Sequence, residues 1–96
     1  MNRIVLRLPA DHASAMGHFP GDPIVPGAVL LDEILAIIAR AHGARTQGWV
    51  VKSVKFLRPV RPGAELEIEL AAAPTGDIRF RCWMGASEVV TGLVQV

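Results

Sequence analysis

The chain has 96 residues, of which 51% are hydrophobic and 20% are charged, and its formal net charge is +1. This length fits a single domain spanning residues 1–96, and the near-neutral charge with only 5% aromatic residues disfavours nucleic-acid binding. A small monomer does not easily bury so large a share of hydrophobic residues. We therefore expect a homodimer or a larger assembly.

Membrane insertion, secretion and disulfide formation are all disfavoured. The longest apolar stretch, residues 28–41, carries three charges and is too short to form a membrane span. The first ten residues lack the pattern of a signal peptide, and the single cysteine, Cys82, has no partner for an internal disulfide. These features favour a cytoplasmic protein.

The N-terminal part predicts one strand and a rigid loop. Residues 4–8 alternate between apolar and polar positions, which predicts a short strand that Pro9 ends. Residues 10–17 are predicted to form a loop. The following segment, residues 17–27, holds three prolines and three glycines in eleven positions, so its backbone has little freedom.

Residues 28–42 predict the only long helix. It follows the pair Pro26-Gly27, where a missing amide proton costs little, and it ends before Gly43, a residue suited to a left-handed cap. Apolar side chains occur nearly all round this helix. We therefore expect the helix to be buried on all sides.

The rest of the chain predicts strands at residues 49–56, 65–70, 78–84 and 88–96, separated by turn sequences rich in proline and glycine. The residues expected to face the core are Val50, Val54, Phe56, Leu66, Ile68, Leu70, Ile78, Phe80, Cys82 and Met84. The simplest packing wraps a curved antiparallel sheet around the single helix, which is an α+β fold.

Two titratable residues flank the rigid loop. His18 stands before it and can serve as a general base near neutral pH, or it is an ordinary loop histidine bonded to a carbonyl. Asp32 lies inside the apolar helix, where burial would raise its pKa and make it an acid. Alternatively, Asp32 and Glu33 form a solvated patch near the helix N-terminus.

The first residues of the helix offer unpaired hydrogen-bond donors. The amides of Gly27 and Ala28 have no partner within the helix and lie at its positive end. A thioester or enolate oxygen could accept hydrogen bonds from them, or water or a loop carbonyl could do so instead.

The remaining histidines, the cysteine and the basic residues give weaker indications of a functional site. His12 and His42 have no ligand at metal-binding spacing, so we expect neither a metal nor a cofactor. We expect Cys82 to be a buried, inert thiol rather than a nucleophile. Basic residues in the middle of the chain could receive an acidic carrier protein or a phosphate, or they are ordinary surface charge. They are Arg45, Lys52, Lys55, Arg58 and Arg61.

Residues 18–27, His-Phe-Pro-Gly-Asp-Pro-Ile-Val-Pro-Gly, together with Asp32, resemble the signature of the 3-hydroxyacyl-[acyl-carrier-protein] dehydratases. That signature is His-Phe-Pro, then Pro-x-x-Pro-Gly, with an acidic residue five positions after the last glycine. Residues 54–63, Val-Lys-Phe-Leu-Arg-Pro-Val-Arg-Pro-Gly, resemble a second and less specific segment of the same family. The resemblance extends over roughly residues 3–96, and the chain looks closest to the short stand-alone members.

The resemblance implies a hotdog fold, in which a curved antiparallel sheet wraps a long helix. It also implies a homodimer or a trimer of dimers, with active sites at the dimer interface and acyl carrier protein as the partner that brings the substrate. Transferred to this chain, His18 would take the proton beside the thioester carbonyl. Asp32 would hold or protonate the leaving 3-hydroxyl, and the Gly27 or Ala28 amide would bind the thioester oxygen.

Three functions remain open at this point. The first is dehydration of 3-hydroxyacyl thioesters to trans-2-enoyl thioesters in fatty acid or related lipid or polyketide biosynthesis. The second is a non-catalytic hotdog module that binds acyl thioesters, which the shortness of the chain favours. The third is a hotdog thioesterase, against which the His-Phe-Pro motif speaks.

Overall fold

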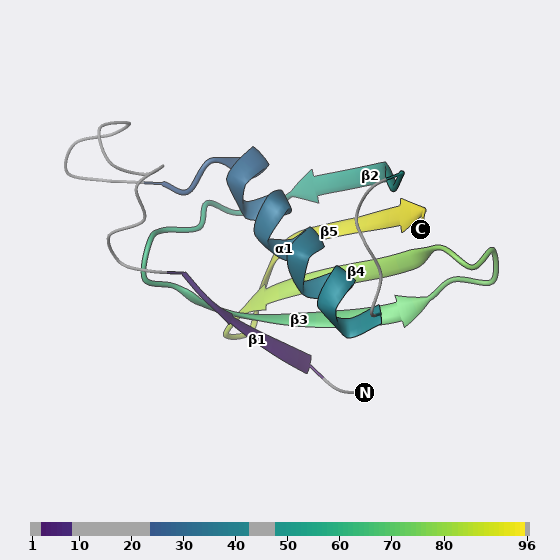
Figure 1. Ribbon diagram of the computed structural model, residues 1–96. Helices are drawn as coiled ribbons and strands as arrows, with labels where there is room; N and C mark the ends of the chain where they lie inside the picture. The colour runs from purple at the N-terminus through teal and green to yellow at the C-terminus, as the bar shows by residue number, and fades with distance from the viewer. Residues whose placement is uncertain (1–2, 9–23, 43–47, 96) are drawn as a thin grey trace.

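The computed structural model describes residues 3–8, 24–42 and 48–95. Within these ranges the chain forms one helix and five strands (Figure 1). Their bounds are β1 (Arg3–Arg7), α1 (Gly27–His42), β2 (Val50–Phe56), β3 (Glu65–Ala72), β4 (Ile78–Met84) and β5 (Ser87–Gln95). The predicted elements are thus present, and the helix starts one residue earlier than expected.

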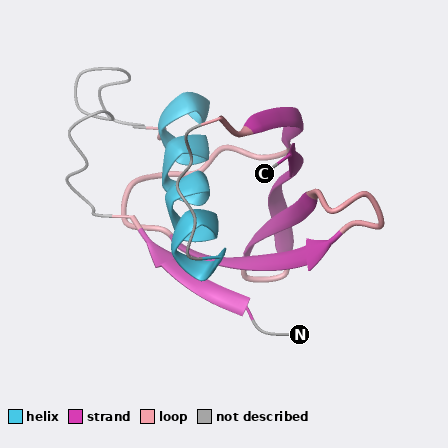
Figure 2. Ribbon diagram, turned by 45° about the vertical axis from the view of Figure 1, so that its right-hand side comes forward, coloured by secondary structure: helices cyan, strands magenta, loops and turns pink. Residues whose placement is uncertain are grey.

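The strands form a single antiparallel sheet in the order β1-β3-β4-β5-β2. The helix α1 lies against one face of this sheet, and the strands curve beneath it (Figure 2). After α1 the chain enters β2 at one edge of the sheet, while β1 occupies the opposite edge. The predicted α+β arrangement of a curved antiparallel sheet packed on one helix is confirmed.

The core fills the space between α1 and the sheet. Ile34 and Ile38 lie one turn apart on α1 and are fully buried, and Phe80 of β4 is buried opposite them in the same cluster. Burying an apolar side chain of this size stabilises the fold by about 1.5–3 kcal/mol. The inward-facing residues come from every second position of the strands, as the pleat requires.

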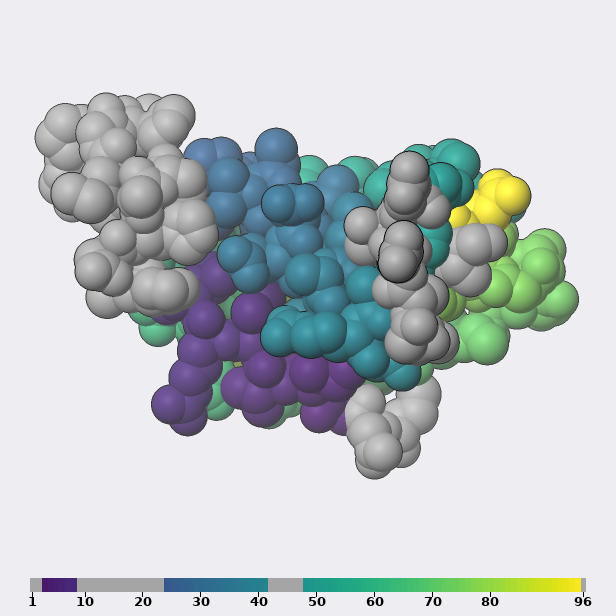
Figure 3. Space-filling model, in the orientation of Figure 1, coloured from purple at the N-terminus to yellow at the C-terminus, as the bar shows by residue number. Residues whose placement is uncertain are grey.

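The helix is not buried on all sides, so that prediction is wrong. Ala28, Asp32, Ala36 and Arg40 follow one another at intervals of four residues and are all exposed. Atoms of α1 accordingly reach the molecular surface, as Figure 3 shows. The sheet covers only one side of the helix, and small side chains on the opposite side leave a stripe of the helix uncovered.

The predicted inner face of β2 is wrong at one position. The pairing of β2 with β5 shifts register between Val51 and Ser53, as in a β-bulge. The extra residue reverses the alternation, so Val51 shares the inner face with Val54 and Phe56. Val50 points the other way, and it is 52% exposed.

The alternation predicted for β3 and β4 is confirmed at all positions except the last. Leu66, Ile68, Ile78, Phe80 and Cys82 are buried, and Leu70 packs against the core from a half-buried position. Met84, however, is 37% exposed. It follows a second register shift, between Cys82 and Trp83, and lies at the end of the β4–β5 hairpin.

Candidate active site

The start of α1 is tied to the connection between β2 and β3. The Val25 amide donates a hydrogen bond to the Val60 carbonyl over 2.8 Å, and the Leu30 amide donates to the Pro26 carbonyl over 3.0 Å. The first bond fixes where the chain enters the helix, and the second is the first turn of the helix itself. Gly27 therefore lies in a defined position beside residues 56–60.

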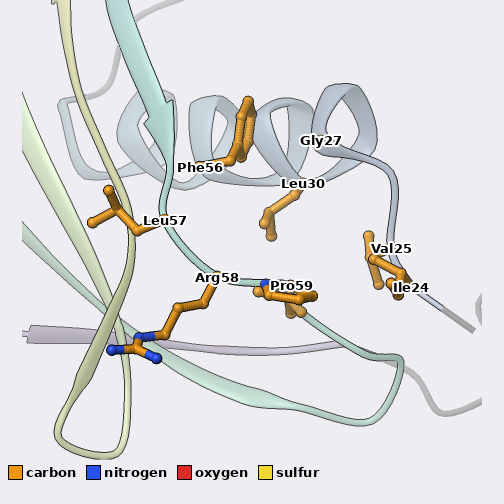
Figure 4. A pocket seen from close by; sticks show the side chains of 9 residues that line it. Ile24, Val25, Gly27, Leu30, Phe56, Leu57, Arg58 and Pro59 are labelled. Carbon is orange, nitrogen blue, oxygen red and sulfur yellow. The ribbon is translucent and has the colours of Figure 1, made fainter. Parts of the chain in front are cut away.

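A pocket of about 330 Å³ opens at this junction (Figure 4). Its lining comes from the end of the loop, the first turn of α1 and the segment after β2. The lining residues are Ile24, Val25, Gly27, Leu30, Phe56, Leu57, Arg58, Pro59 and Val60. In the close-up, the Phe56 ring stands beside the first turn of the helix, while the Arg58 guanidinium extends away from the pocket. Apolar walls next to a polar backbone suit a ligand with an apolar chain and a polar head.

Gly27 contributes the start of α1 to this pocket. Gly27 and Ala28 occupy the first two positions of α1, so their amides lack the partner four residues earlier that later amides have. No hydrogen bond joins either amide to another residue in the described part of the chain. Of the two, Gly27 lines the pocket, whereas Ala28 is on the exposed stripe.

Phe56 packs directly against Gly27. A Cβ atom built on Gly27 would lie 3.1 Å from Cζ of the Phe56 ring, closer than a side chain comfortably tolerates. Phe56 is 47% exposed and lines the pocket. A residue larger than glycine at position 27 would therefore displace the ring from the pocket wall.

Asp32 does not share this pocket. It is exposed on α1, one turn after Ala28 on the same stripe, and it is absent from the pocket lining. The sequence allowed two interpretations of Asp32. Burial within its own chain is wrong, and the alternative, exposure to solvent, is what the single chain shows. Its neighbour Glu33 is half-buried.

Other predicted residues have different outcomes. His18 and His12 lie outside the described residues, as does most of the rigid loop. Cys82 is fully buried, as expected, and burial raises the pKa of its thiol to about 12, which agrees with an inert thiol. In the described ranges no group of histidine, cysteine and acidic residues could hold a metal ion. No helix there is long and apolar enough to cross a membrane.

Residues 56–60 build most of one pocket wall, although their sequence did not mark them as part of the site. The available signal was the second family-like segment, residues 54–63, which contains them. Periodicity alone could not have found them, because their place depends on the pairing of β2 at the sheet edge next to the start of α1.

Comparison with known proteins identifies the family. The sequence model of the ApeI-like family, described as ApeI dehydratase, matches residues 2–93. A curated relative from Geobacter metallireducens, named 3-hydroxyacyl-[acyl-carrier-protein] dehydratase FabZ, is 38% identical over 87 residues. That match covers 81% of this chain but only 57% of the relative, so the chain spans little more than half of its length.

Solved structures agree with this assignment. The dehydratase heterocomplex ApeI:P from Xenorhabdus doucetiae superposes with a TM-score of 0.73 at 25% identity, covering 97% of this chain and 83% of that one. The (R)-hydratase from A. caviae involved in PHA biosynthesis has a TM-score of 0.65 at 20% identity, covering 99% and 92%, and shows the fold alone. The chain belongs to the ApeI-like dehydratase family, within the hotdog-fold 3-hydroxyacyl-[acyl-carrier-protein] dehydratases.

Proposed function

We propose that this protein removes water from 3-hydroxyacyl thioesters carried on acyl carrier protein, giving trans-2-enoyl thioesters for fatty acid or related lipid or polyketide biosynthesis. The observation that carries the proposal is the apolar pocket lined by Gly27 at the start of α1, whose amide has no hydrogen-bond partner among the described residues. It places a hydrogen-bond donor at the mouth of a cavity that suits an acyl chain. The cytoplasm is the predicted location.

The proposed reaction needs one base, one acid and one oxygen-binding donor. His18 takes the proton from the carbon next to the thioester carbonyl, and the electron pair of that bond forms the new double bond. The carbon–oxygen bond to the 3-hydroxyl breaks, and Asp32 supplies the proton with which the oxygen leaves as water. The Gly27 amide, with Ala28 beside it, stabilises negative charge that develops on the thioester oxygen. No electron is gained or lost, so the reaction requires no redox cofactor.

The exposure of Asp32 supports a site shared between two chains. This acid is exposed and does not line the pocket that its own chain builds, which is compatible with a site completed by a second subunit. The outer edge of β2 is unpaired in the described sheet and lies beside the pocket residue Phe56. We propose a homodimer, or a trimer of dimers, in which the pocket of one subunit meets Asp32 of the other.

A second, related chain could take the place of the identical partner. The Xenorhabdus doucetiae relative is described as the dehydratase heterocomplex ApeI:P. Sedimentation of the purified chain separates the alternatives. A stable dimer with dehydratase activity supports the homodimer, whereas a monomer that turns over substrate only after a second chain is added supports a heterocomplex.

The direct test is turnover of a defined substrate. The purified protein is mixed with 3-hydroxyacyl-carrier thioesters, and the loss of water is followed by intact mass. We expect conversion by wild type and none above background by His18→Ala. Equal rates for the two proteins would refute the proposed role of His18, and no conversion by either would refute the activity.

Mixing two inactive variants tests the shared site. If His18 and Asp32 of one active site come from different chains, His18→Ala and Asp32→Asn subunits form mixed dimers with one intact site. Random exchange of subunits then restores about a quarter of the wild-type rate, because half of the dimers are mixed and each has one working site. No recovery after verified exchange would contradict the shared site.

A non-catalytic module that binds acyl thioesters is the second candidate. The observation in its favour is that the described part of one chain has a pocket but no acidic side chain lining it. This candidate predicts binding of the carrier-bound acyl chain without turnover, and equal tolerance of His18→Ala and Asp32→Ala. Release of free thiol in the same assay would instead identify a thioesterase.

A further inference from the structure

The face of the sheet opposite α1 carries regularly paired charges. Six lysines and arginines lie on the described strands, and four of them contact a carboxylate. The pairs are Arg3–Glu67 at 2.8 Å, Arg7–Glu65 at 3.0 Å, Lys52–Asp77 at 2.7 Å and Arg81–Glu88 at 2.5 Å. Each cation on the strands is thus matched with an acid on a neighbouring strand or turn, with two exceptions.

The exceptions are Lys55 of β2 and Arg79 of β4, which are exposed and make no ion pair with any other described residue. Both line the same hollow of about 150 Å³. The remaining lining comes from the Ser53 and Thr91 side chains and from Gly92. These two cations therefore share one depression, and none of the described residues that line it carries a carboxylate.

The strand register explains how these side chains meet. Lys55 pairs with Thr91 on β5, and Ser53 pairs with Leu93, which in turn pairs with Arg79 on β4. Residues paired in this way point to the same side of a sheet. Lys55, Ser53, Thr91 and Arg79 thus rise from three adjacent strands around one point, on the face away from α1.

We propose that this hollow, which we call the Lys55–Arg79 hollow, binds a phosphate group. Two positive side chains that line one hollow without a counter-charge among the described residues repel, and a bound anion removes that cost. The Arg79 guanidinium matches the oxygen spacing of a phosphate, and the Lys55 ammonium adds a compact charge with three donors. The volume is some ten times what a single water molecule needs, so a tetrahedral anion fits with part of its hydration.

The hollow is not the basic cluster that the sequence suggested. Of the five residues named there, Lys52 is held by Asp77, and Arg58 lines the pocket near Gly27. Arg61 makes an interaction of its own, and Arg45 lies outside the described residues. Only Lys55 belongs to the hollow, and its partner Arg79 comes from a strand that sequence proximity did not connect with it.

The site does not depend on the proposed dehydratase activity. The phosphate could be free inorganic phosphate or the phosphate ester of a pantetheine arm. Both present phosphate oxygens that can accept hydrogen bonds from Lys55 and Arg79. The two sources are separated by comparing inorganic phosphate with 4′-phosphopantetheine in the same titration.

The test is a titration of the isotope-labelled protein with inorganic phosphate at constant ionic strength, followed by the amide signals of Ser53, Lys55, Arg79 and Thr91. We expect saturable shifts confined to these strands. Lys55→Gln or Arg79→Gln each weakens binding about tenfold or more, since each removes a hydrogen bond to a charged group. Lys55→Arg, which keeps the charge, retains most of the affinity, whereas Arg79→Lys, which loses the planar guanidinium, weakens binding less than Arg79→Gln.

The matched control is Arg7→Gln, which also removes one exposed positive charge from a strand, but from a cation already paired with Glu65. It leaves phosphate affinity unchanged if the hollow is the site. The proposal is overturned if shifts do not saturate, or if Arg7→Gln weakens binding as much as Arg79→Gln. Thermal unfolding of each variant verifies that the fold is intact. Tighter binding of 4′-phosphopantetheine at the same residues assigns the site to a carrier arm, and equal binding assigns it to free phosphate.

Discussion

The Phe56 ring rests on the backbone of Gly27, with its Cζ atom 3.1 Å and its Cε2 atom 3.2 Å from where a Cβ of residue 27 would be. This contact joins the edge strand β2 to the first turn of α1 and forms one wall of the pocket. It also explains why the smallest residue occupies the first position of the helix. The side chain of any other residue would compete with the ring for the same space.

Gly27→Ala should therefore reduce activity more than stability. The added methyl group displaces the Phe56 ring from its place in the pocket wall, while alanine is a better helix residue than glycine by up to about 1 kcal/mol. We expect an unfolding midpoint close to that of wild type and a lower kcat/KM for the acyl thioester. The double variant Gly27→Ala/Phe56→Leu, in which the ring is absent, should recover part of the loss. A double variant no better than Gly27→Ala would show that the amide rather than the ring is affected.

Gly92→Ala should destabilise the fold where β5 pairs with β2 and β4. A Cβ atom on Gly92 would overlap the ring of Phe80 and lie 2.7 Å from the carbonyl oxygen of Ser53. Overpacking of this kind costs roughly 1–3 kcal/mol, measured as the free energy of unfolding in urea. Adding Phe80→Leu should not restore wild-type stability, because the clash with the Ser53 backbone remains. Wild-type stability of Gly92→Ala would contradict the close packing of β2 on β5.

Asp77 should contribute stability that is lost in acid. The carboxylate is 5% exposed, accepts a hydrogen bond from the Lys52 ammonium over 2.7 Å and another from the Thr75 hydroxyl over 2.9 Å. These bonds, the one from Lys52 foremost, lower the pKa of Asp77 below its ordinary value of 3.8. The folded state therefore binds fewer protons than the unfolded state below about pH 4, and stability falls as the pH drops.

The measurement is thermal unfolding of wild type and Asp77→Asn between pH 3 and pH 7. The variant should unfold at a lower temperature at neutral pH, and the difference should shrink as the pH falls below about 4, where wild-type Asp77 also loses its charge. Lys52→Met removes the same ion pair from the other side. A stability gap between wild type and Asp77→Asn that is constant across this range would exclude a role for the charge.

Cys82 should be unreactive in the folded protein. Its side chain is fully buried, and the desolvation of the thiolate raises the pKa to about 12. We expect no alkylation by iodoacetamide at pH 8 in buffer and complete alkylation in denaturant, followed by mass. The unfolded thiol ionises near pH 9, whereas the buried thiol of the folded protein stays protonated up to about pH 12. The free energy of unfolding therefore falls as the pH rises from about 9 toward 12. Cys82→Ala should lack this alkaline component.

Local patterns in the sequence determined the elements and much of the fold. The alternation in residues 65–70 places Leu66 and Ile68 in the core because the side chains of a strand point alternately to two faces. The Pro26-Gly27 pair marked the start of the helix to within one residue, since proline cannot supply an amide proton inside it. The family resemblance rested on residues 18–27 and 54–63, and the family match confirms it.

Only the tertiary structure decided what depends on contacts between distant segments. The bulge in β2 reversed the faces of Val50 and Val51, because the pairing with β5 rather than local preference determines the register. Asp32 proved to be exposed because the sheet covers only one side of α1, which the composition of the helix does not reveal. Lys55 and Arg79, far apart in the chain, share a hollow because β5 lies between their strands.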